Sequence, residues 1–213
     1  LRSPNRFSHV FLGAAAQAGY ALNPDFNGPS QEGVGMYQVT QKNGERLSAA
    51  AAFLKPHLHR PNLKVITNAH ATRIVIEGGR AVGVEYAQGG ERKSLRARRE
   101  VLLSAGALQS PQLLMLSGIG PGAQLQQFGI ATVHDAPGVG QHLHDHLDVV
   151  QVVNTPGRTD LFGLSLKGVV NVIKGLFEWQ RHRRGMLTTN FAEAGGFIKS
   201  QPSEALPDLQ LHF

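Results

Sequence analysis

The sequence predicts a mixed α/β fold that combines the central part of a doubly wound domain, a β-meander and part of an antiparallel sheet. Three observations support this prediction. Residues 100–120, EVLLSAGALQSPQLLMLSGIG, have the pattern of a buried strand, a tight turn and a helix. Residues 62–104 contain short apolar runs separated by Gly-Gly pairs, which are typical of hairpins. Near the end, an amphipathic helix precedes the alternating run NFAEAGGFI, which is typical of a strand.

The first part of the chain predicts a helix, a loop, a strand and a second helix. Residues 7–22 have helical apolar spacing, and Gly19 is a stop signal. The loop NPDFNGPSQEGVG consists of turn-forming residues throughout. MYQVTQ then predicts a strand, and LSAAAAFLKPHL predicts a helix that begins at Ser48 and is broken by Pro56.

The middle of the chain predicts five strands, LKVIT, TRIVIE, AVGVEY, KSLRA and EVLLS. The inner three are expected to form an antiparallel meander, and the outer two to belong to a parallel sheet. Beyond residue 120 we expect a short helix (AQLQQFGI), a loop (PGVGQHLHDHLDV), a strand (VVQVV) and a further loop. A helix over residues 166–183 then leads to the final strands.

Small residues fill the turn after the strand EVLLS. The run SAGA at 104–107 offers almost no side chain, so another backbone or a flat ligand can approach closely. Ser110 and Pro111 have the pattern of a helix cap and first helical position, and Gly118 that of a stop. Ligands of open α/β sheets lie beyond the strand ends. The turn therefore predicts either a binding site or simply tight packing of a helix on a sheet.

Composition narrows the function classes. The chain has 213 residues, 41% of them hydrophobic, no cysteine and no apolar run long enough to cross a bilayer. The formal net charge is +6, but the basic runs ERKSLRARR and RHRR are not interleaved with aromatic residues. These runs predict a solvated basic surface and no nucleic-acid site, and they leave association with a membrane surface open.

Three alternating histidines offer an alternative function. His142, His144 and His146, with Asp145 and Asp148 beside them, place imidazoles on one face of an extended segment. Histidine is the commonest metal ligand, so this segment predicts a metal-binding module as the second hypothesis. A third hypothesis is a structural or interaction fragment that self-associates through exposed sheet edges.

Four motifs, in their order and spacing, resemble the glucose-methanol-choline oxidoreductases, above all the bacterial choline and alcohol dehydrogenases. The motifs are NPDFNGPSQEGVG, GALQSPQLLMLSGIGP, PGVGQHLHDH and FAEAGGFI. The resemblance implies FAD as the cofactor and an alcohol as the substrate, with hydride passing to the flavin. It implies that Ser104, Ala105 and Gly106 lie near the adenosine half of FAD, and that the backbone of Ala71 meets the adenine. It also makes Asp145 and His146 part of a structural turn, with His142 standing where an Asn is usual.

The resemblance further implies a division of the chain. Residues 1–60 border the FAD and substrate domains, residues 61–146 belong to the FAD domain, and residues 147–213 belong to the substrate domain. The family's Gly-x-Gly-x-x-Gly turn and its catalytic histidine find no match here, so no catalytic residue is assigned. We expect a piece of a longer protein that alone binds FAD poorly and is inactive. The implied location is the bacterial cytoplasm or the cytoplasmic face of the inner membrane.

Glu193 is the candidate substrate-binding residue. It lies between small residues on a strand suited to burial, and a buried carboxylate needs a partner. The partner is either an arginine or, as the resemblance implies, the trimethylammonium group of a choline-like substrate. Trp179, on the amphipathic helix, is expected in the core rather than in an aromatic cage. Choline, a simple primary alcohol and an aromatic or polyether alcohol all remain candidate substrates.

Overall fold

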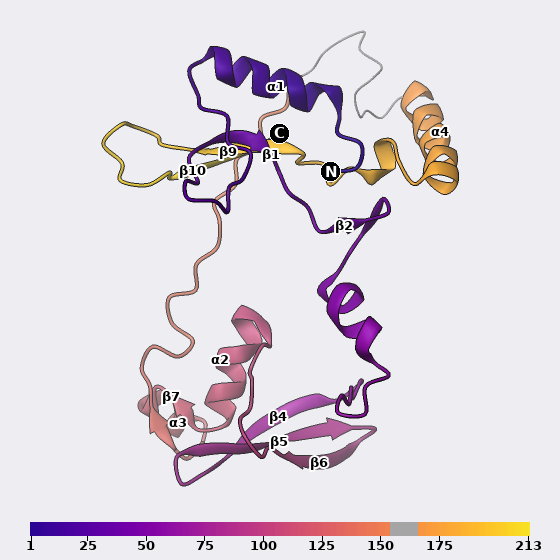
Figure 1. The fold of residues 1–213 in the computed structure, drawn as a ribbon. Helices are drawn as coiled ribbons and strands as arrows, with labels where there is room; N and C mark the ends of the chain where they lie inside the picture. The colour runs from indigo at the N-terminus through magenta and orange to yellow at the C-terminus, as the bar shows by residue number, and fades with distance from the viewer. Residues whose placement is uncertain (154–165) are drawn as a thin grey trace. The chain divides into compact units, whose positions relative to one another are not determined.

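The computed structural model describes residues 1–153 and 166–213, and these fall into two compact units (Figure 1). The first unit combines Leu1–Arg60 with Val153–Phe213, and the second consists of Pro61–Val152. The loop expected between the strand VVQVV and the amphipathic helix lies outside the described residues. None of the described helices combines the length and the apolarity that a membrane crossing requires.

A three-stranded antiparallel sheet forms the centre of the first unit. Its order is β1-β9-β10, and one helix, α1, lies across it (Figure 1). The bounds are α1 Arg6–Gln17, β1 Gly33–Met36, β9 Ala194–Ile198 and β10 Leu209–His212. Val34 and Ala194 are fully buried, and Gly35 of β1 stands opposite Gly195 of β9. The core of this unit therefore lies between α1 and the β1-β9 pair.

Shorter elements complete the first unit. A small hairpin and the α4 helix are joined by a side chain, because the Trp179 indole N–H donates to the carbonyl of Gly44 over 2.8 Å. The bounds are β2 Gln41–Lys42, β3 Glu45–Arg46, η1 Ala50–Leu54, η2 Lys55–His57, α4 Leu166–His182 and η3 Met186–Thr188. Of these, η1 is a π-helix, and η2 and η3 are 3₁₀ helices.

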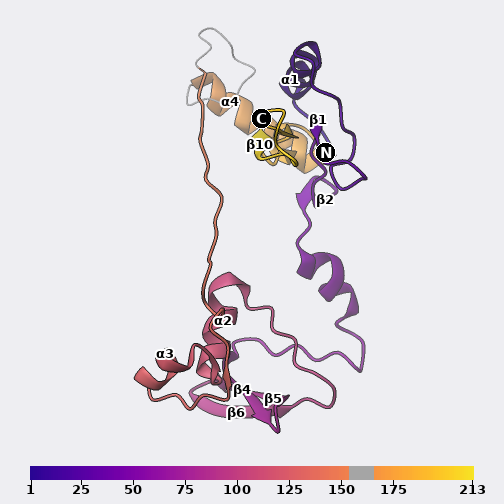
Figure 2. The ribbon, with the colours of Figure 1, turned by 90° about the vertical axis from the view of Figure 1, so that its left-hand side faces the viewer.

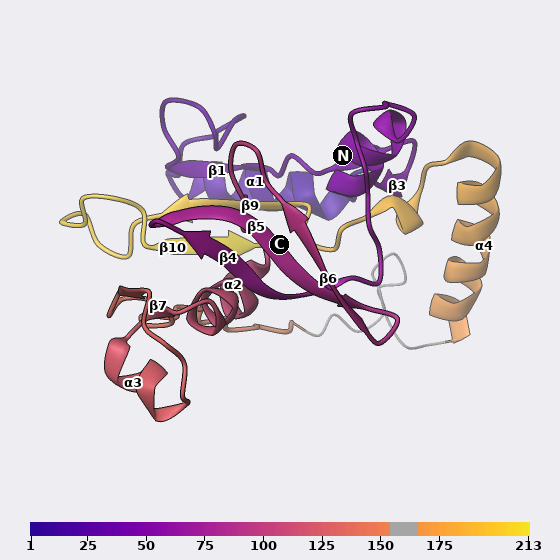
Figure 3. The same cartoon turned by 90° about the horizontal axis from the view of Figure 1, so that it is seen from below.

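The second unit is built on a meander, β4-β5-β6 (Figure 3). The strands are β4 His70–Glu77, β5 Arg80–Gln88 and β6 Glu91–Arg96. Gly78 and Gly79 have φ values of 55° and 77°, and Gly89 and Gly90 have 61° and 84°. Two successive positive φ angles are the requirement of a type I′ hairpin turn, which is why both turns are Gly-Gly.

One helix, α2 (Gly106–Leu116), packs on strand β4 of the meander. The buried Ser117 hydroxyl accepts from the Ile74 amide over 2.8 Å and donates to the Leu113 carbonyl over 2.6 Å. This side chain therefore ties the end of α2 to β4. The remaining elements are β7 Ile119–Gly120, α3 Gly122–Gln127 and β8 His134–Asp135, with β7 and β8 parallel.

Several sequence predictions are confirmed. The mixed α/β class, the meander with both Gly-Gly turns, α3, α4 and the loop over 137–148 are all present. Helix α1 is present but ends at Gln17, ahead of Gly19, whose φ is 91°. Ser48 begins the next helical segment, since its hydroxyl accepts from the Ala51 amide over 3.2 Å, but that segment is a π-helix followed by a 3₁₀ turn.

Three predicted strands are wrong. Residues 63–67, 100–104 and 149–153 form no strand, because no described segment pairs with them and a strand exists only through its ladder bonds. The expected burial on both faces is also wrong for EVLLS, since Leu102 is 81% exposed. The strand predicted as MYQVTQ is also misplaced. Only its first and last residues, Met36 and Gln41, lie in strands, and β1 begins at Gly33, inside the stretch that was expected to be a loop.

The predicted start of α2 is also wrong. The helix begins at Gly106, so Ser110 and Pro111 lie inside it. The Ser110 hydroxyl accepts a hydrogen bond from the Ala105 amide over 3.1 Å. Pro111 removes the single bond that its own amide would have donated one turn back, and the helix continues around this missing bond.

Candidate functional site

Glu193 lies immediately before β9, and its side chain is only 3% exposed. Its Oε2 accepts a hydrogen bond from the Asn5 amide and another from the Ser8 hydroxyl, the latter over 3.2 Å. Both donors belong to the first turn of α1, where the Asn5 side chain caps the Phe7 amide over 2.9 Å. The carboxylate therefore sits at the N-terminal end of a helix, whose partial positive charge favours an anion.

A cavity of about 290 Å³ opens beside this carboxylate. Glu193 and Arg6 both line it, so residues of both charge signs contribute to its wall. The remaining lining is small or polar, apart from Pro4 and Met186. The full lining consists of Ser3, Pro4, Asn5, Arg6, Gly185, Met186, Thr189 and Glu193. The cavity has the size and polarity to admit a small polar molecule.

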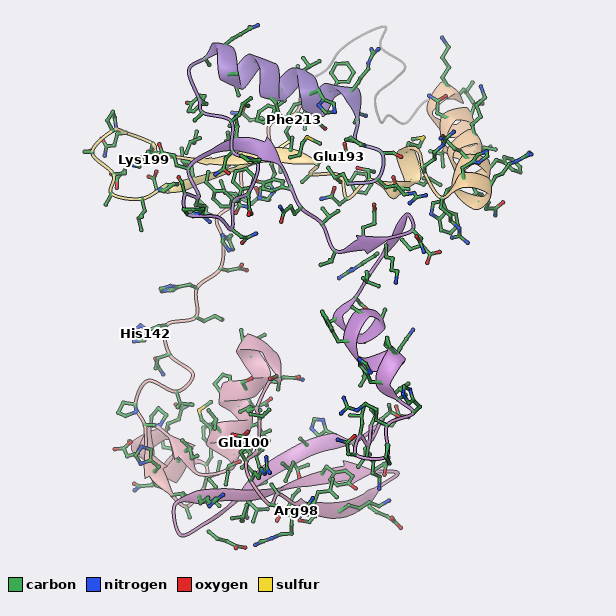
Figure 4. All side chains as sticks on the ribbon, viewed as in Figure 1. Arg98, Glu100, His142, Glu193, Lys199 and Phe213 are labelled. Atoms are coloured by element: carbon green, nitrogen blue, oxygen red, sulfur yellow. The ribbon has the colours of Figure 1, made fainter. Side chains whose placement is uncertain are left out.

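Strand β9, which follows Glu193 directly, is fixed by close packing. A Cβ atom on Gly195 would lie 1.9 Å from the Leu211 carbonyl oxygen and 2.6 Å from the Tyr37 ring. The Tyr37 hydroxyl donates to the same carbonyl over 2.5 Å, and burial raises the pKa of this phenol although hydrogen bonds partly oppose the shift. Glu193 and Phe213 lie at the same part of the sheet (Figure 4), where the Glu193 amide donates to the Phe213 carbonyl over 2.9 Å.

The turn at 104–106 lies in the second unit and is open. Ser104 and Gly106 are exposed, and a Cβ atom on Gly106 would meet nothing within 4 Å. Gly106 has a φ of 87°, a conformation that suits glycine, and it begins α2. A flat ring can therefore approach this backbone without meeting a side chain. This openness leaves room for the adenosine half of FAD, and the contact of these residues with it stays a prediction.

Ala71 lies on β4 of the same unit. It is exposed and stands opposite Tyr86, next to a shift of register before Arg73. A methyl group at this point leaves the β4 backbone accessible, as a backbone contact requires. Ala71 and the turn thus belong to one unit, and Glu193 belongs to the other.

The sequence of the chain matches a known protein family over most of its length. Residues 1–148 match the GMC oxidoreductase family. The chain belongs to the GMC oxidoreductases. It is 47% identical to an alcohol dehydrogenase (acceptor) of Pseudomonas putida over 100% of this chain and 39% of that protein. It is 44% identical to an oxygen-dependent choline dehydrogenase of Brucella ovis, over 98% of this chain and 38% of that protein.

Solved GMC-type structures have the same fold. A crystal structure of formate oxidase matches with a TM-score of 0.73 and 28% identity, covering 92% of this chain and 35% of that chain. An FAD-dependent oxidoreductase from Chaetomium thermophilum matches with a TM-score of 0.76 and 27% identity, covering 90% and 34%. The chain therefore spans about two fifths of the length of the curated relatives it matches.

The histidine segment does not gather into a metal centre. His142, His144 and His146 are exposed on a stretch without helix or strand, in which Figure 4 labels His142. The His146 amide donates to the Asp145 carboxylate over 2.8 Å. Within 1–153 and 166–213, no group of three or more His, Cys, Asp or Glu side chains is close enough to hold a metal ion. His142 has a φ of 56°, a left-handed conformation that Asn, Asp and His adopt more readily than other residues with a side chain.

Sequence reasoning missed the residues that hold Glu193. Asn5 and Ser8 were not identified as its partners, although Asn5 in SPNRFS has the type and position of a helix cap. It also missed Ser117, because the sequence LSG around it indicates only the end of a helix.

The expected arginine partner of Glu193 stays a prediction. Trp179 does not line the Glu193 cavity, and the Arg183 guanidinium lies 4.4 Å from its ring centroid.

Proposed function

We propose that the chain is part of an FAD-dependent oxidoreductase that oxidises the CH–OH group of a primary alcohol, with choline among the candidate substrates. The relatives support this proposal, because one is named an alcohol dehydrogenase and another a choline dehydrogenase. The observation that carries it is Glu193, a carboxylate that is 3% exposed yet lines a cavity of about 290 Å³. A few polar groups that line a cavity are the usual features of a binding site.

In this proposal the second unit contributes part of the FAD site. The backbone of Ala71 meets the adenine, and the open turn of Ser104, Ala105 and Gly106 lies along the adenosine half. The bound flavin supplies the hydride acceptor. The role of these residues is to leave room for the cofactor and to offer backbone groups, which is why small side chains suffice.

Glu193 then orients the substrate in the first unit. The two donors from α1 fix the position of its carboxylate, so it meets a bound alcohol in a set geometry. A cationic substrate would gain Coulomb attraction to Glu193, strengthened by low exposure to water. Arg6 lines the same cavity and opposes that gain, so an uncharged primary alcohol fits the cavity as well.

The test compares choline with its uncharged carbon isostere in the protein at its natural length. In Glu193→Gln we expect the Michaelis constant for choline to rise roughly tenfold or more, and that for the isostere to change less than about twofold. The glutamine oxygen still accepts from Asn5 and Ser8, so the fold is expected to be retained. Glu32→Gln is the matched control, since Glu32 is exposed and pairs with Lys199 over 3.4 Å.

Two outcomes would contradict this role of Glu193. Equal changes of both Michaelis constants would make Glu193 a structural residue. Loss of the thermal unfolding transition in Glu193→Gln, with Glu32→Gln intact, would lead to the same conclusion. A protein at natural length that oxidises neither alcohol and binds no FAD would overturn the proposed activity itself.

A further inference from the structure

An apolar stripe runs along the outer side of α4. Its members recur at intervals of three and four residues and so share one helix face. They are largely exposed, namely Leu166 (89%), Val169 (56%), Val170 (48%), Ile173 (50%) and Phe177 (67%). Five large apolar side chains on one face of a single helix form a patch of the kind that marks an interaction surface.

The other side of α4 is anchored to the first unit. Gly175 is buried, and a Cβ atom there would lie 2.7 Å from Met186, so α4 and η3 are in close contact. The Trp179 indole is held by Gly44 over 2.8 Å and covered by Arg183. Figures 1 and 2 show α4 apart from α1 within this unit. The packing therefore fixes the rotation of α4 and directs the stripe away from η3 and the hairpin to which α4 is anchored.

A row of cations borders the stripe. Lys167, Lys174 and Arg181 are seven residues apart, which places them nearly in line along the helix, and all three are exposed. Between residues 166 and 184 there are five lysines and arginines and a single acidic residue, Glu178. Long basic side chains beside an apolar face can extend their charges toward anionic headgroups while their methylene stems cover apolar surface.

We propose that α4 docks the protein on the surface of a bilayer that contains anionic lipid. The helix has 17 residues and is about 25 Å long, so it lies in the interface with its stripe at the boundary between headgroups and acyl chains. The charge distribution selects this occupant. A symmetric contact with a second copy would bring two rows of cations together, whereas an anionic surface neutralises the row.

The test measures flotation of the protein, at its natural length, with vesicles of phosphatidylcholine alone or with added phosphatidylglycerol. The protein is expected to float with the anionic vesicles and to be released by salt. Replacing Lys167, Lys174 and Arg181 with Gln should lower the partition coefficient by about two orders of magnitude. Arg92, Arg98 and Arg99 are exposed in the second unit, and their replacement with Gln is the matched loss of three charges, with less than about a twofold effect.

A second variant tests whether the apolar stripe enters the bilayer, and it keeps a large apolar side chain at the substituted position. In Phe177→Trp, lipids with brominated acyl chains should quench the new indole. The share of indole fluorescence that is quenched should be larger than in the unaltered protein, whose Trp179 lies on the anchored side of α4. Absence of flotation, equal losses in both triple variants, or no gain in quenching in Phe177→Trp over the unaltered protein would overturn the proposal. The proposal would also be overturned if sedimentation without lipid showed a dimer that the α4 triple variant no longer forms.

Discussion

The two three-stranded sheets of this chain are assembled in opposite ways. The strands of β4-β5-β6 follow one another within residues 70–96, and each turn is a Gly-Gly pair. In β1-β9-β10, by contrast, β1 ends at Met36 and β9 begins at Ala194. The chain loses more conformational entropy when it closes so long a loop than when it closes a two-residue turn. The candidate substrate residue, Glu193, is attached to the sheet that depends on distant segments.

Glycine has a different role in each sheet. In the meander, Gly78 and Gly79 provide the positive φ angles of a turn and border open space. In β9, Gly195 and Gly196 lie within the strand, where a Cβ atom would collide with neighbouring strands. Local backbone conformation therefore explains the glycines of the meander turn, and the close approach of distant segments explains those of β9.

The largest effect is expected from Gly195→Ala. The added methyl group would lie 1.9 Å from the Leu211 carbonyl oxygen, and neither backbone can yield without breaking the β9-β10 ladder. We expect a loss of roughly 3 kcal/mol or more in the free energy of unfolding, measured by denaturant titration. Gly13→Ala is the control, because nothing lies within 4 Å of a Cβ atom at that helical position. It should stabilise by about 0.4–1 kcal/mol. Equal stability of the two variants would mean that β9 is not packed as described.

A smaller effect is expected in the meander unit from Ser117→Ala. The substitution leaves the buried Ile74 amide without its partner and removes the link between α2 and β4. We expect a loss of about 1–3 kcal/mol in the free energy of unfolding. Ser94→Ala, at an exposed position of β6, should change stability by less than about 0.5 kcal/mol. If both substitutions had the same effect, the α2–β4 link would contribute no more than an exposed hydroxyl does.

The smallest effect concerns the exposed pair of Glu77 and Arg96, which joins β4 to β6 through bonds of 2.5 and 2.9 Å. The hydrogen bond from Arg96 is the main cause that lowers the pKa of Glu77. The pair therefore contributes stability above the unfolded-state pKa of Glu77 and loses it as the pH falls through the lower folded-state value. NMR titration of the carboxyl carbon should show the Glu77 pKa rising in Arg96→Gln. An unchanged pKa would mean that the pair does not persist in solution.

Much of the fold was predictable because its signals are local. Gly-Gly turns, alternating runs and the apolar spacing of α4 each depend on neighbouring residues, and the structure confirms them. The outer strands LKVIT and EVLLS were predicted wrongly because a strand needs a partner, and composition does not say whether one is present. The start of α2 was misplaced because Ser110 and Pro111 have the pattern of a cap, whereas the helix tolerates both residues inside it.

From the sequence alone it follows that Glu193 is a carboxylate in a run of small residues suited to burial, and that the turn at 104–106 has almost no side chains. The expected position of Glu193 on the strand was off by one residue, because β9 begins at Ala194. Tertiary structure alone decided which groups hold that carboxylate. Its partners, the Asn5 amide and the Ser8 hydroxyl, lie 188 and 185 residues away in the chain. The physical reason is that periodicity reports only which face of an element is buried. The pairing of one buried face with another depends on chain closure and packing over the whole unit.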